Sequence, residues 1–178
     1  MEYSKVLVIG AEETGPREIT TCLVKLEKSL DVLTCSSLPI PGERDLQQAG
    51  IQFICFVILT SNKESLNVVS ACLSKVDFSY FSGRCVLVVN NKDSHFDEGI
   101  DAEIKNLARK FDVQSLYVNT QDESELLELG KKIVAMVDAI RGSNRFVTSM
   151  LFESMRVLGH RNNATTYVGQ DTPVTGNF

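Results

Sequence analysis

The chain has 178 residues, of which 43% are hydrophobic, and a formal net charge of −5. This length suggests a single domain that buries a sizeable core without disulfides or metals, and the acidic balance argues against a general nucleic-acid or anionic-membrane binder. No apolar run approaches the ~18 residues of a membrane span, and the start, MEYSKVLVIG, does not resemble a signal peptide, so we expect a soluble intracellular protein.

Five short β-rich runs recur along the chain, and three of them are almost continuously apolar. That pattern is typical of strands covered on both faces, as in a parallel sheet. Amphipathic helical patterns lie between and after these runs, and we expect Thr14, Ser61 and Thr120 to cap helix starts. The predicted strands are residues 5–10, 31–35, 53–59, 84–90 and 115–119, and the predicted helical stripes lie within 19–26, 66–76, 104–111 and 126–140.

Strands that alternate with helices predict a three-layer α/β fold. We expect one domain over residues 1–159, with a mostly parallel five-stranded sheet in the order 2-1-3-4-5. The link 36–50 is predicted to be mostly loop, with a short helix near residues 44–48. The polar tail, residues 160–178, has little to bury, and we expect it to be disordered.

The cysteines indicate a reducing compartment. Their number, five, is odd, no two have C-x-x-C spacing, and each lies in an apolar run. We therefore interpret them as free thiols that act as small core residues. His95 and His160 are isolated in polar segments, so the sequence predicts no metal site. The cysteines are Cys22, Cys35, Cys55, Cys72 and Cys85.

The first strand–helix turn contains the remnant of a phosphate-binding loop. Gly10 and Gly15 have the separation of the two glycines in G-x-x-x-x-G-K-[ST]. Pro16 and Arg17 stand where the Lys and the Ser/Thr belong, so one N–H donor, the Lys charge and the hydroxyl that ligates Mg²⁺ are lost. The loop also contains two carboxylates, Glu12 and Glu13, each of which would repel a nearby phosphate by about 1 to 4 kcal/mol.

A second remnant follows the fourth predicted strand. Small GTPases have N-K-x-D there, with the Asn and the Asp on the guanine base; Asn90 and Asp93 fall on these positions, and Asn91 replaces the Lys. Polar residues are also common in such loops. The D-x-x-G that GTPases need after their third strand is absent, and about 40 residues between Gly10 and the next apolar strand leave no room for two switches.

The segments FICFVILTSNKESL (53–66) and VDFSYFSGRCVLVVNN (76–91) resemble Ras-type GTPases in layout. They resemble the centromere protein M family more closely, through the pattern V-D-x-S-[YF]-F-x-G-[KR] at residues 76–84. This resemblance implies a small-GTPase-like fold that lacks the switch regions, a pseudoenzyme rather than an enzyme, and no cofactor or metal.

The resemblance also implies a role in cell division. The family supplies a structural subunit of the inner kinetochore, within the constitutive centromere-associated network. It packs against centromere protein I and joins centromere proteins H and K, which implies a nuclear, centromeric location and a part in chromosome segregation at mitosis. It implies no small-molecule substrate, no specific nucleic-acid contact and no membrane.

A protein without a working pocket acts through its surface, and the last apolar segment, 145–158, is the best candidate. Met and Phe side chains there favour a partner-docking surface, although the segment would equally serve to close an edge or face of the sheet. The loop 77–81, with three aromatic residues, is a second candidate, and core anchors are the alternative there. The helical stripe of the last segment comprises Val147, Met150, Leu151, Met155 and Leu158.

Two alternatives remain open from the residues alone. One is a divergent GTP-binding protein that uses Arg17, Asn90 and Asp93. The other is a flavodoxin-like module that binds phosphate or flavin at the carboxyl ends of the strands, where this fold usually binds its ligands.

Overall fold

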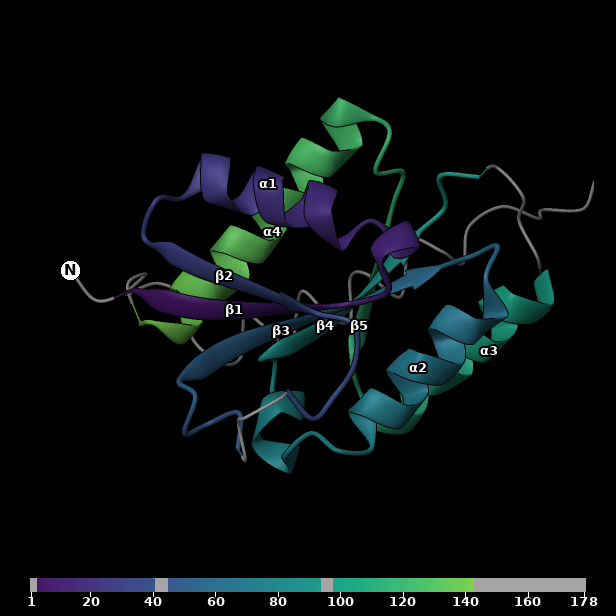
Figure 1. The fold of residues 1–178 in the computed structure, drawn as a ribbon, viewed down its shortest axis with the longest axis horizontal. Coiled ribbons are helices and arrows are strands. Elements are labelled where there is room, and N and C mark those ends of the chain that lie inside the picture. The colour runs from purple at the N-terminus through teal and green to yellow at the C-terminus, as the bar shows by residue number, and fades with distance from the viewer. Residues whose placement is uncertain (1–2, 41–44, 94–97, 143–178) are drawn as a thin grey trace, which may run out of the picture. The chain divides into compact units, whose positions relative to one another are not determined.

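A computed structural model describes residues 3–40, 45–93 and 98–142. Its centre is a parallel sheet of five strands in the order β2-β1-β3-β4-β5, which confirms the predicted fold class and strand order (Figure 1). The strands are β1 (Ser4–Ile9), β2 (Leu30–Cys35), β3 (Ile51–Leu59), β4 (Cys85–Asn90) and β5 (Gln114–Val118). The helices are α1 (Pro16–Leu26), α2 (Lys63–Leu73), α3 (Glu98–Phe111) and α4 (Glu123–Ile140), with 3-10 turns η1 (Glu12–Thr14) and η2 (Phe78–Phe81).

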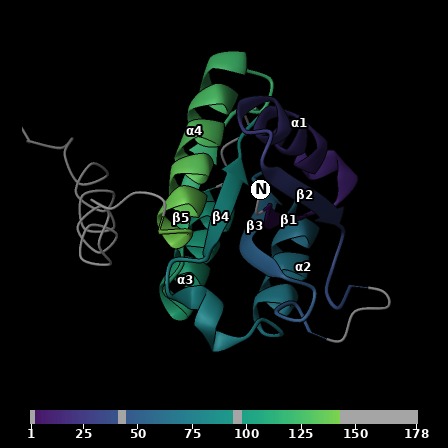
Figure 2. The ribbon, with the colours of Figure 1, turned by 90° about the vertical axis from the view of Figure 1, so that its left-hand side faces the viewer.

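Helices cover both faces of the sheet. α1 and α4 pack on one face and α2 and α3 on the other, as Figures 1 and 2 show. The central strands β3 and β4 are buried almost throughout, which explains their continuous apolar sequences. Alternate residues such as Leu7, Phe56 and Leu87 pack toward α2 and α3. None of the helices in the described ranges is both long and apolar enough to cross a bilayer.

α1 and α4 approach each other closely at a glycine. A Cβ atom at Gly130 would lie 2.5 Å from Cδ1 of Leu26 and 2.8 Å from Sγ of Cys22. The thiol of Cys22 donates a hydrogen bond to the carbonyl of Leu126, at 3.4 Å. The absence of a side chain at Gly130 therefore permits the close contact between the two helices.

The predicted caps of α2 and α4 were placed too early. The carboxamide oxygen of Asn62, not the hydroxyl of Ser61, accepts the first N–H groups of α2, from Glu64 at 2.9 Å and Ser65 at 3.3 Å. In α4, Asp122 rather than Thr120 does the same. Both sequences offer two neighbouring capping residues, and Asn or Asp is at least as good a cap as Ser or Thr.

The predicted short helix near residues 44–48 is wrong for the described part of that range. Residues 46–50 form a turn, in which Ala49 N–H donates to the Asp45 carbonyl at 3.0 Å and Gly50 N–H to the Gln47 carbonyl at 2.9 Å. Gly50 then adopts φ = 74°, which ends the turn and leads into β3. The predicted domain end at residue 159 and the predicted tail 160–178 lie outside the described residues.

The cysteines are free thiols, as predicted. Cys55, Cys72 and Cys85 are buried, whereas Cys22 and Cys35 are only partly buried. Burial raises the pKa of Cys35 to about 11, and burial likewise raises the pKa of Cys22 and Cys72. These thiols are therefore protonated near neutral pH, which makes them poor nucleophiles.

Candidate nucleotide site at the carboxyl edge of the sheet

The loops that follow β1, β3, β4 and β5 meet at the carboxyl edge of the sheet. The strand order reverses there between β1 and β3, which is where open parallel sheets bind their ligands. The phosphate-loop remnant follows β1 and the base-motif remnant begins at the end of β4, so both lie at this edge. Their hydrogen bonds decide whether the edge is open to a nucleotide.

Three backbone N–H groups of the first loop already bond to carbonyl groups of the protein. The N–H of Gly10 donates to the Cys35 carbonyl at 3.0 Å, and that of Thr14 to the Ala11 carbonyl at 2.9 Å. The N–H of Gly15 points back to the Glu12 carbonyl at 3.5 Å, and Pro16 has none. A phosphate loop works through free N–H groups, and these positions of the remnant offer none.

Thr14 closes this loop instead of capping α1, which corrects the prediction. Its hydroxyl donates to the Ala11 carbonyl at 2.7 Å, and it ends the 3-10 turn η1. Gly15 is the N-cap residue of α1, with φ = 97° and no side-chain cap, and Pro16 occupies the first helical position, where a missing N–H costs nothing. A Cβ atom at Gly10 would lie 2.6 Å from the Thr14 hydroxyl oxygen, so the turn is tightly closed.

Arg17 forms a salt bridge with Glu12 at 3.3 Å, and both side chains are more than 80% exposed. A pair this exposed contributes little free energy. Arg17 therefore has an ionic partner in its own loop. No described contact links it to Asn90 or Asp93.

Asn90 holds the centre of the edge, fully buried. Its amide nitrogen donates to the Thr14 carbonyl and to the Thr120 hydroxyl, both at 2.8 Å. Its amide oxygen accepts the N–H groups of Lys92 at 3.1 Å and Thr120 at 3.3 Å. An Asn side chain has two donors and two acceptor positions, so the protein itself uses the whole capacity of Asn90. The side chain joins the loops that follow β1, β4 and β5.

The remaining residues of the base-motif remnant also contact neighbouring loops. Asp93 accepts a hydrogen bond from the Ser61 hydroxyl, and the exposed Asn91 donates its backbone N–H to the Val118 carbonyl at 2.9 Å. Lys92, which belongs to none of the recognised motif positions, donates from Nζ to the Glu13 carbonyl at 2.6 Å. In the GTPase pattern N-K-x-D the Lys would stand at position 91, and here a Lys follows one position later. That Lys was the available sequence evidence for a cation at this edge.

Glu13 completes the closure of the first loop. Its carboxylate accepts a hydrogen bond from the Asn62 amide at 3.4 Å, while its carbonyl receives Lys92. The four loops of the carboxyl edge are therefore bridged by their own side chains, with a carboxylate at the place where a phosphate would need attraction.

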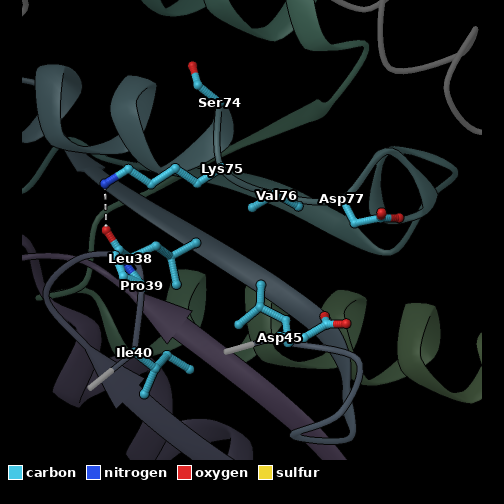
Figure 3. A pocket seen from close by; sticks show the side chains of 9 residues that line it. Leu38, Pro39, Ile40, Asp45, Ser74, Lys75, Val76 and Asp77 are labelled. Carbon is cyan, nitrogen blue, oxygen red and sulfur yellow. Dashed lines mark hydrogen bonds between the residues drawn. The ribbon is translucent and has the colours of Figure 1, made fainter. Parts of the chain in front are cut away.

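A pocket of about 280 Å³ lies elsewhere, between the link that follows β2 and the carboxyl-terminal end of α2 (Figure 3). Because α2 begins at the carboxyl edge, this pocket lies at the opposite end of the helix. Lys75 reaches across it and donates from Nζ to the Leu38 carbonyl at 2.8 Å, while Asp45 and Asp77 line its other side. No group of three or more metal-ligating side chains occurs within the part of the chain that the structure describes.

The two predicted partner surfaces have different outcomes. The stripe in the last apolar segment, Val147, Met150, Leu151, Met155 and Leu158, lies outside the described residues. In the loop 77–81, Tyr80 is fully buried, Phe81 is partly buried, and Phe78 is 82% exposed. The core interpretation therefore holds for Tyr80, and Phe78 remains available at the surface.

These observations define a doubly wound α/β protein whose usual ligand edge is closed by its own hydrogen bonds. The chain matches the family model of centromere protein M over residues 1–158 and belongs to that family. Among curated proteins it is similar to Centromere protein M of Xenopus laevis, with 23% identity over 145 residues, which cover 80% of this chain and 81% of the relative.

Proposed function

We propose that this chain is a non-catalytic structural subunit of the inner kinetochore, a pseudo-GTPase that acts by protein contact. Its partners in this proposal are centromere protein I, together with centromere proteins H and K. The complex would serve kinetochore assembly and chromosome segregation.

The full engagement of Asn90 is the observation that carries the pseudo-GTPase part of the proposal. A nucleotide-binding Asn would need to leave the Thr14 carbonyl and the Thr120 hydroxyl, which are otherwise buried without this donor. Each such loss costs about 1 to 3 kcal/mol. The N–H groups of the first loop that already donate within the protein and the carboxylate of Glu13 also oppose nucleotide binding. They oppose phosphate or flavin binding equally.

Family membership supports the location. The chain belongs to a family of centromere proteins, so a nuclear, chromosomal site of action follows at that coarser level. The family model extends to residue 158, 16 residues beyond the last described residue, Gly142. It therefore includes the apolar segment 145–158, which agrees with a role for that segment.

Nucleotide binding is the first test. We expect no saturable binding when the purified chain is titrated with fluorescent GTP or GDP in the presence of Mg²⁺. N–H groups of the loop already donate to carbonyls of the protein, and the carboxylates of the loop would repel the phosphates. Denaturation of the purified chain should release no nucleotide, and an active small GTPase provides the positive control. Binding with a Kd in the micromolar range or below, about 8 kcal/mol or more, would contradict the pseudo-GTPase proposal.

The partner proposal needs a separate test on the last apolar segment. Leu151→Glu and Met155→Glu should leave the circular-dichroism spectrum and the melting temperature unchanged while abolishing copurification with centromere protein I, since a charge at an apolar contact is desolvated without a partner. Ser149→Glu, which lies off the stripe, is the matched control and should copurify normally. Normal copurification of both stripe variants would exclude this segment as the docking surface.

A further inference from the structure

We draw no further inference here: the strongest candidate, the pocket between the link that follows β2 and the carboxyl-terminal end of α2, is lined by residues on both sides of positions 41–44, which lie outside the described residues, so nothing in the structure shows what covers it.

Discussion

Replacement of Asn90 by Leu is expected to lower the free energy of unfolding by about 3–5 kcal/mol. The substitution keeps the approximate size of the side chain but removes all four of its hydrogen bonds. The Thr14 carbonyl and the Thr120 hydroxyl then remain buried without the amide donor, and each unsatisfied group costs about 1–3 kcal/mol. The loss of stability should exceed that from removing a single hydrogen-bonded pair, because the one side chain connects three loops.

Equilibrium unfolding in urea, followed by circular dichroism, measures this effect. Asn91→Ala is the matched control, because Asn91 is the next residue but has an exposed side chain, and it should change the free energy of unfolding by no more than about 0.5 kcal/mol. Equal effects of the two substitutions would mean that the network around Asn90 does not hold the carboxyl edge together.

The role of Asn90 also shows where sequence-based prediction ends. Alignment with a nucleotide-binding motif placed Asn90 at the end of the fourth strand, where the structure has it, because that motif follows a recognisable apolar strand. Its hydrogen-bond partners Thr14 and Thr120 lie 76 and 30 residues away in the sequence. No local pattern reports such a pairing, so the change from a candidate ligand-binding residue to an internal support is visible only in the fold.

The strands themselves were predictable because their signal lies in the local sequence. Burial on both faces requires continuous apolar sequence, and β3 and β4 have it. Helix starts were predicted less accurately, since Asn62 and Asp122 each follow within two residues of another capping residue and local sequence does not decide between them. The turn at residues 46–50 was mistaken for a helix because one turn and the start of a helix share the same short-range pattern.

The segment 76–84, on which the resemblance to the centromere protein M family rests, has a clear structural purpose. Asp77 accepts the N–H of Ser79 at 2.9 Å and starts η2, and hydrogen bonds from Ser79 lower the pKa of the Asp77 carboxyl. Gly83 adopts φ = 84°, a conformation that favours glycine. The motif is therefore explained by folding requirements rather than by ligand chemistry.

Tyr80 and Arg84 tie this segment to the beginning of β3. The Tyr80 hydroxyl donates to the Ile51 carbonyl at 2.7 Å. Arg84 donates from Nε to the Gln52 carbonyl at 3.1 Å and from a terminal nitrogen to the Ile51 carbonyl at 3.3 Å, and its guanidinium lies 4.4 Å from the centre of the Tyr80 ring. Tyr80 therefore provides both apolar packing and a support for Arg84.

Tyr80→Ala is accordingly expected to lower the free energy of unfolding by about 3–5 kcal/mol, as for other buried aromatic residues. The change creates a cavity beside β3 and leaves the guanidinium of Arg84 without the ring beneath it. Phe78→Ala lies in the same 3-10 turn, but at 82% exposure it should cost no more than about 0.5 kcal/mol. Urea unfolding of the two variants provides the comparison. If Phe78→Ala destabilises the chain as much as Tyr80→Ala does, then η2 is not anchored through Tyr80, and the segment 76–84 must contribute to the fold in another way.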